Sequence, residues 1–83
     1  MTYKRFKEEV ESMGLECWCH DDWHVYATKD EDICGVVSRE TQYVVRIPFG
    51  GFHLLSEQQK HDLFQLVTSL AETPLEERGE IVK

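Results

Sequence analysis

The sequence has few basic residues, few cysteines and no long apolar run, and each shortage excludes a class of protein. Lys and Arg number 9 against 16 Asp and Glu, so the formal net charge is −7. Phosphate binding needs a basic surface, which argues against a DNA- or RNA-binding protein. No stretch approaches the roughly 20 apolar residues that span a bilayer, and the N-terminal segment MTYKRFKEEVESMG lacks the apolar core of a signal peptide. We therefore expect a protein of the reducing cytoplasm that binds neither nucleic acid nor membrane.

The cysteines are too few and too closely spaced for a disulfide framework. Cys17 and Cys19 are two positions apart, a spacing that one strand cannot easily bridge, and Cys34 makes the number odd. A chain of 83 residues with 41% hydrophobic residues forms one domain with a narrow margin of stability. We place that domain at residues 1–74 and expect a charged C-terminal tail at 75–83, with room for one more turn.

Hydrophobic periodicity predicts a helix near each end of the chain. Phe6, Val10 and Met13 repeat at helical spacing, which predicts a helix over Tyr3–Met13. A second helix begins at the capping box that Ser56 opens, and its apolar stripe continues to about Glu72.

Four short segments between these helices have the composition of strands and are separated by short polar loops. The expected strands are Leu15–His20, Trp23–Thr28, Ile33–Ser38 and Tyr43–Pro48. The pair Gly50-Gly51 then interrupts the pattern, and we expect no regular element there. The expected fold is α+β: a four-stranded antiparallel meander with the N-terminal and C-terminal helices packed on one face (α-β-β-β-β-α).

The loop lengths assign each strand residue to a face of the sheet. If Asp21-Asp22 is a two-residue loop, His20 pairs with Trp23, and Cys19 lies opposite His24. Strand alternation then predicts an apolar face beneath the helices, formed by Trp18, Trp23, Val25, Ala27, Cys34, Val36, Tyr43, Val45 and Ile47. The opposite face would carry Cys17, Cys19, His24, Tyr26, Thr28, Gly35, Val37, Val44 and Arg46. A slip of one residue in any loop reverses the assignment of the strands beyond it.

The second of these faces is mixed in polarity and partly apolar. An apolar patch on an open sheet face often marks a contact surface, although Val and Tyr also occur there because they favour strands. We expect contact with another protein, or with a second copy of the chain in a homodimer, through His24, Tyr26, Val37, Val44 and Arg46.

The segment CWCHDDWHVY raises the alternative of a metal site. On the assigned face Cys17, Cys19 and His24 offer two thiolates and an imidazole, which hold zinc if a fourth ligand such as His53 joins them. Strong zinc motifs have paired CxxC knuckles, which this sequence lacks, so we prefer ordinary strand residues and expect no cofactor. A Cys19–His24 pair also resembles an activated nucleophile, but a flat sheet face offers no oxyanion hole, and we expect no enzyme and no catalytic residue.

The C-terminal segment LFQLVTSLAETPLEERGE, residues Leu63–Glu80, resembles the ending of many small proteins encoded by phages and prophages of low-GC Gram-positive bacteria. In those proteins a similar helix runs into Thr-Pro-(Ile or Leu)-Glu-Glu-Arg. The resemblance implies a small accessory protein in the cytoplasm of a bacterial host, acting by protein–protein contact. The acidity, size and layout also look like those of some anti-CRISPR inhibitors, so an acidic inhibitor of a nucleic-acid-binding protein is a further alternative to the metal-binding protein.

Overall fold

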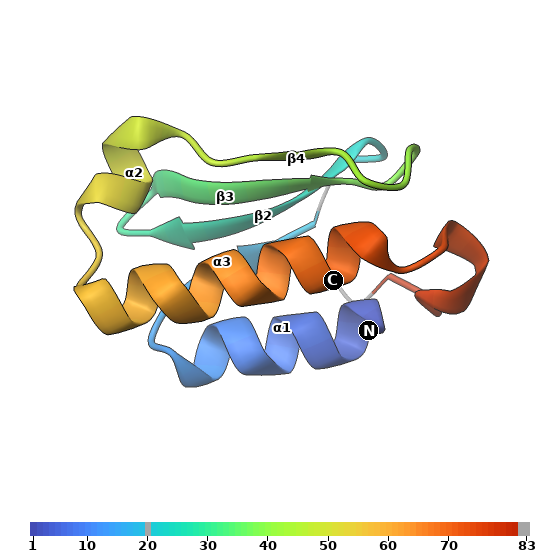
Figure 1. The fold of residues 1–83 in the computed structure, drawn as a ribbon, viewed down its shortest axis with the longest axis horizontal. Coiled ribbons are helices and arrows are strands. Elements are labelled where there is room, and N and C mark those ends of the chain that lie inside the picture. The colour runs from blue at the N-terminus through green and yellow to red at the C-terminus, as the bar shows by residue number, and fades with distance from the viewer. Residues whose placement is uncertain (20, 82–83) are drawn as a thin grey trace.

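The computed structural model describes residues 1–19 and 21–81, and it has the expected α+β architecture. The elements follow in the order α1 (Tyr3–Ser12), β1 (Glu16–Trp18), β2 (His24–Lys29), β3 (Asp32–Ser38), β4 (Val45–Arg46), α2 (Phe49–His53), α3 (Glu57–Glu72) and the 3₁₀ turn η1 (Leu75–Glu77). The strands form one antiparallel sheet in the order β1-β2-β3-β4. In Figure 1, α1 and α3 lie side by side beneath one face of that sheet. The meander and the position of the two main helices are thus confirmed.

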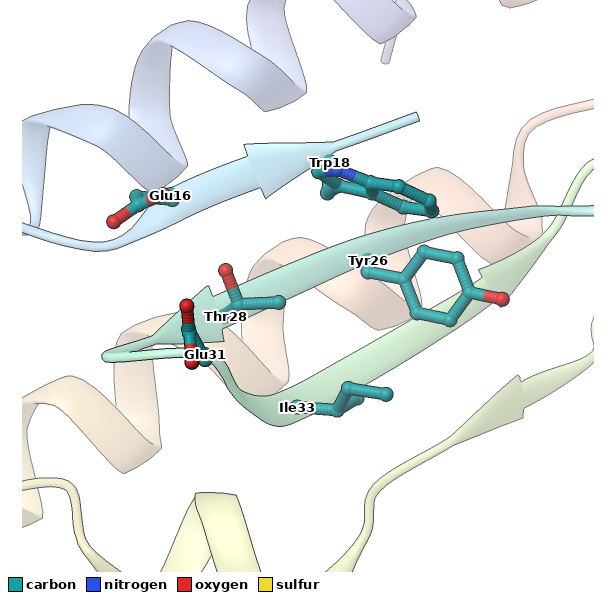
Figure 2. Close-up of a pocket in the computed structure, with 6 residues that line it drawn as sticks. All are labelled: Glu16, Trp18, Tyr26, Thr28, Glu31 and Ile33. Atoms are coloured by element: carbon teal, nitrogen blue, oxygen red, sulfur yellow. The ribbon is translucent and has the colours of Figure 1, made fainter. Parts of the chain in front are cut away.

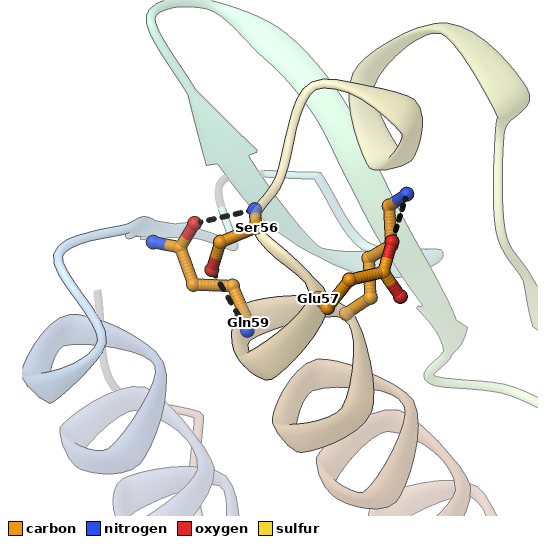
Figure 3. A network of polar contacts seen from close by, with 4 residues as sticks. Ser56, Glu57 and Gln59 are labelled. Carbon is orange, nitrogen blue, oxygen red and sulfur yellow. Dashed lines mark hydrogen bonds and ion pairs between the residues drawn. The ribbon is translucent and has the colours of Figure 1, made fainter.

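Local signals set where both main helices begin. Thr2 caps α1, since its Oγ1 accepts a hydrogen bond from the Arg5 amide at 3.2 Å. The predicted capping box of α3 is present (Figure 3): the Gln59 amide donates to Ser56 Oγ at 3.2 Å, and the Ser56 amide donates to Gln59 Oε1 at 3.1 Å. The Gln59 side chain also donates to the Met13 carbonyl, which ties the start of α3 to the end of α1.

The core lies between the sheet and these two helices. Its fully buried members come from α1, from the inner face of the sheet and from α3, and they include Phe6, Val10, Val25, Ala27, Cys34, Val37, Leu63, Val67 and Leu70. Gly35 of β3 lies against α3 so closely that a Cβ there would be 3.1 Å from Val67 Cγ1. The sheet and α3 therefore pack in direct contact, with little space between them.

The β1–β2 pairing differs by one residue from the expected register. Trp18 pairs with Tyr26, and Cys17 pairs with Ala27, which requires one more residue in the connection than the two-residue loop allowed. Asp21 holds this connection, because its Oδ1 accepts the amides of Trp23 at 2.8 Å and of the following residue. The expected partner of Trp23, His20, lies outside the described residues.

The consequence is that the two faces of β1 are exchanged relative to the prediction. Leu15 and Cys19 are buried in the core, and Cys17 packs against it. Trp18, expected beneath the helices, lies on the opposite face and is exposed, and Trp23 is exposed as well. A strand has a side-chain period of two, so a slip of one residue moves every side chain to the other face.

A β-bulge in β3 exchanges the two faces of that strand as well, relative to the prediction. Asp30 and Glu31 form a tight turn with φ of 49° and 73°, and Thr28 pairs with Ile33 as expected. Ala27, however, pairs with Gly35, so Cys34 is an extra residue in the strand.

Beyond the bulge, Val37 faces the core and Val36 lies on the opposite side of the sheet, both contrary to prediction. Val37 pairs with Val25 and Val45, and Val36 pairs with Tyr26 and Arg46. The connection into β4 adds a compensating shift of one residue. Val45 therefore packs toward the core, and Arg46 away from it, as predicted.

The strand β4 is shorter than predicted, and a short helix takes over part of its position. Tyr43, expected in the core, is exposed and has a φ of 70°. Beyond β4 the chain forms α2 through the two glycines, where we expected no regular element. Gly51 makes this possible, because a Cβ there would lie 1.9 Å from the Ile33 carbonyl oxygen. Glycine thus lets the helix backbone lie directly on β3.

The C-terminal segment is fixed to the domain by one buried arginine. Arg78 is fully buried and donates hydrogen bonds to the carbonyls of Thr73 (2.9 Å), Ser38 (2.6 Å) and Ala71 (3.3 Å). Its guanidinium lies 5.9 Å from the centre of the Tyr3 ring. This arginine belongs to the Thr-Pro-Leu-Glu-Glu-Arg segment, so part of that motif has a structural role. Among residues 1–19 and 21–81, no helix is long and apolar enough to cross a membrane.

Candidate functional site

The face of the sheet that points away from α1 and α3, which we call the open face, carries the candidate site. Strand pairing aligns Trp18, Tyr26, Val36 and Arg46 in one row across all four strands. The adjacent row begins with Glu16 opposite Thr28 and continues with Ile33. Both main helices lie on the other side of the sheet (Figure 1).

Six side chains of the open face enclose a shallow cavity of about 490 Å³, which we call the aromatic trough. Its lining residues are Glu16, Trp18, Tyr26, Thr28, Glu31 and Ile33. Figure 2 shows the rings of Trp18 and Tyr26 toward one end, and the carboxylates of Glu16 and Glu31 toward the other. Trp18 is 47% exposed and Ile33 is 38% exposed. The trough therefore combines accessible apolar surface with two negative charges.

The aromatic end of the trough is held in place by specific contacts. The Trp18 and Tyr26 rings meet edge to face, with centroids 5.5 Å apart and an interplanar angle of 61°. The Tyr26 hydroxyl donates to Asp21 Oδ2 at 2.7 Å. That hydrogen bond lowers the pKa of Asp21, since it favours the carboxylate, and it raises the pKa of Tyr26. The Tyr26 ring is thus fixed by the same carboxylate that holds the β1–β2 connection.

Of the predicted contact residues, Tyr26 lines the trough, and His24 and Arg46 lie beside it. His24 is next to Tyr26, with ring centroids 5.8 Å apart, and Arg46 is in the same row of the sheet. Val44 is exposed near the end of β3, where its carbonyl accepts the Ser38 amide at 3.0 Å. Val37 is fully buried against the helices, because the bulge at Cys34 turns it inward. The placement of Val37 on a contact surface was therefore wrong.

The residues of the metal alternative do not come together. Cys17 and Cys19 face the core, and His24 is on the open face, so the expected cross-strand pair of Cys19 and His24 does not form. Among the residues that the structure describes, no group of three His, Cys, Asp or Glu side chains is arranged to hold a metal ion. The fourth candidate, His53, stacks on Phe49 within α2, with centroids 5.0 Å apart.

Two of the cysteines, Cys17 and Cys34, lie in surroundings that disfavour the thiolate. Burial raises the pKa of the Cys17 thiol to about 12, and the neighbouring Cys19 adds to the shift. Burial also raises the pKa of Cys34. Reactive cysteines need a lowered pKa and access to solvent, so these thiols have the properties of structural residues.

Sequence reasoning missed two residues of the trough. It placed Trp18 in the core and gave no contact role to Glu16. A signal was present, since Glu16 lies between Leu15 and Cys17 in the chain. That alternation favours an inward Leu15 and Cys17 over the register that a two-residue loop imposed.

Comparison of the chain with protein-family models, with curated proteins and with solved structures finds no match. The geometry of the open face is therefore the basis for a functional proposal.

Proposed function

We propose that this chain is a non-enzymatic accessory protein of the phage type that acts by protein–protein contact through its open face. The observation that carries the proposal is the aromatic trough, in which Trp18 and Ile33 are accessible beside a Tyr26 that is already fixed in place. Tryptophan, tyrosine and arginine are the residues most enriched among those that dominate binding energy at protein interfaces.

The fixed geometry of the trough supports binding because it lowers the entropic cost of association. Side chains that become ordered only on binding each oppose association by about 0.5–1.5 kcal/mol. Tyr26 is held by Asp21, and Trp18 packs against Tyr26, so two large side chains have lost much of this freedom before a partner arrives. His24 and Arg46 extend the polar rim of the same surface.

The geometry of the open face supports the two alternative functions to different degrees. The metal-binding protein needs Cys17, Cys19 and His24 on one face, and they lie on opposite faces. The acidic inhibitor of a nucleic-acid-binding protein also acts by contact, and Glu16 and Glu31 in the trough favour a basic partner of that kind.

The proposal is tested by affinity capture from lysates of low-GC Gram-positive bacteria with three baits: the wild-type protein, Trp18→Ser and Phe64→Ser. Phe64 on α3 is a matched control, because it is 49% exposed and Trp18 is 47% exposed, but it belongs to the helix layer. We expect one protein to be retained by the wild type and by Phe64→Ser and to be lost with Trp18→Ser. Circular dichroism verifies that all three baits are folded. Retention of the same proteins by all three baits contradicts the proposal.

A further inference from the structure

We propose that the aromatic trough receives the side chain of a lysine or arginine from an exposed basic segment of the partner protein. This inference rests on the proposed contact function and specifies its chemistry. It follows from the charge, the shape and the aromatic character of the trough.

The negative charge of the trough favours a cationic ligand. Glu16 and Glu31 are both exposed acidic residues on its lining, and no Lys or Arg is among the described residues that line it. Arg46 shares the row of Trp18 and Tyr26, but it is on β4, at the opposite edge of the sheet from Glu16 on β1. Nothing in the lining therefore neutralises the two carboxylates, and a cationic ligand forms charge-assisted hydrogen bonds with them.

The shape of the trough matches a long side chain with a charged end. The apolar surfaces of Trp18, Tyr26 and Ile33 accommodate a methylene stem, and the carboxylates toward the other end reach the charged group (Figure 2). A neutral or acidic side chain lacks the attraction to these carboxylates.

The overall charge decides between a basic partner and a second copy of the chain. With a net charge of −7, two copies repel one another, and facing their open faces brings four trough carboxylates together. The same charge attracts a basic segment and speeds its encounter with the trough. The occupant is therefore a basic segment of a different protein.

The test uses small probes that carry one side chain each: acetyl-arginine amide, acetyl-lysine amide and acetyl-citrulline amide, the last a neutral isostere of arginine. The chain has 2 tryptophans, so the indole region of a ¹⁵N–¹H correlation spectrum holds two signals, and Trp23→Phe assigns them. We expect the Trp18 signal to move saturably with the arginine and lysine probes. Citrulline should bind about fivefold more weakly, the effect of losing one exposed ion pair at its upper range.

A pair of double variants isolates the trough from the general negative charge. Glu16→Gln with Glu31→Gln should weaken the arginine probe about fivefold or more. Glu8→Gln with Glu76→Gln removes the same charge from exposed positions on α1 and η1, and should leave binding unchanged. Equal binding of citrulline and arginine, equal weakening by both double variants, or no movement of the Trp18 signal overturns the inference.

Three further results separate this inference from the proposed function. If Trp18→Ser loses the captured partner but the Glu16 and Glu31 double variant retains it, the contact function stands and the cation site is wrong. If Trp18→Ser retains the partner, the contact function itself fails. A dimer in sedimentation velocity that Trp18→Ser dissociates assigns the trough to a second copy and overturns the inference.

Discussion

Replacing Gly51 with alanine should destabilise this protein far more than replacing its neighbour Gly50. Both glycines lie in α2, but only Gly51 approaches β3. An added Cβ at position 51 would be 1.9 Å from the Ile33 carbonyl oxygen, 2.5 Å from its carbonyl carbon and 3.1 Å from the Cys34 amide nitrogen. At position 50 an added Cβ meets no atom within 4 Å. The two variants therefore differ in steric contact and share the same chemical change.

The expected loss in free energy of unfolding follows from these distances. Favourable contacts between non-bonded heavy atoms lie at about 3.5 Å, so α2 must move away from β3 by on the order of 1.5 Å. The obstructing atoms are backbone atoms held in the sheet, so they cannot yield as a flexible side chain does. Overpacking of a close contact costs about 1–3 kcal/mol, and we place Gly51→Ala near the upper value, about 3 kcal/mol. Gly50→Ala should instead stabilise the helix by about 0.5–1 kcal/mol.

Urea unfolding followed by circular dichroism measures both effects. Typical stabilities of 0.05–0.15 kcal/mol per residue give about 4–12 kcal/mol for 83 residues, so a loss of about 3 kcal/mol moves the midpoint clearly. In thermal unfolding the same loss lowers Tm by about 12–24 °C at this chain length. If the free energy of unfolding of Gly51→Ala lies within about 0.5 kcal/mol of the wild type, the close packing of α2 on β3 is wrong.

Three further changes test the buried arginine, the cysteines and the trough. Arg78→Met should lower the free energy of unfolding by about 3 kcal/mol, because two buried carbonyls and one partly buried carbonyl lose a charged donor. The pKa of Cys17, raised from 9.0 to about 12, implies stability that is fully present below pH 9 and lost as the pH rises toward 12. In urea unfolding, the free energy of unfolding of Cys17→Ala should therefore fall less steeply than that of the wild type as the pH rises from 9 to 12. Tyr26→Phe should raise the pKa of Asp21 toward its ordinary value of 3.8, because it removes the hydrogen bond that lowers it, and carboxyl NMR titration reports the change.

Each of these changes has its own control. Arg5→Met removes an exposed arginine whose nearest carboxylate is 3.8 Å away, and it should alter stability by less than about 0.5 kcal/mol. A similar effect of Arg78→Met would mean that Arg78 is not buried among its carbonyls. Parallel pH profiles for Cys17→Ala and the wild type would refute burial of that thiol. Tyr43→Phe removes a hydroxyl from an exposed tyrosine, and an equal shift of the Asp21 pKa in both tyrosine variants would exclude the direct hydrogen bond.

The elements that sequence predicted best are those whose signals are local. The capping box at Ser56 and the apolar stripe behind it specify where α3 begins and which side of it is buried, and α3 has the predicted extent. Gly14 directly follows the C-cap Met13 of α1 and has a φ of 83°, the left-handed conformation that glycine commonly adopts after a helix. These features depend on neighbours within a few residues, so no knowledge of the tertiary structure is required.

The candidate site was predicted less well because it depends on register. The sequence placed Tyr26 and Arg46 correctly on the open face, and placed Trp18 and Val37 on the wrong sides. The first error came from one extra residue in the connection that Asp21 holds, and the second from the bulge at Cys34. Each is a change of one residue, and the alternation of a strand converts it into a complete exchange of faces.

The sequence by itself determined the class of this protein: an acidic α+β domain with helices at both ends of a four-stranded meander. Charge, periodicity and capping are properties of composition and of near neighbours, and they persist in any arrangement of the chain. Only the tertiary structure decided that Trp18 lies beside Tyr26, that Gly51 rests on β3, and that Arg78 is buried. These contacts join residues of different segments of the chain. Their geometry is set by strand register and by the close approach of backbones, neither of which a local pattern specifies.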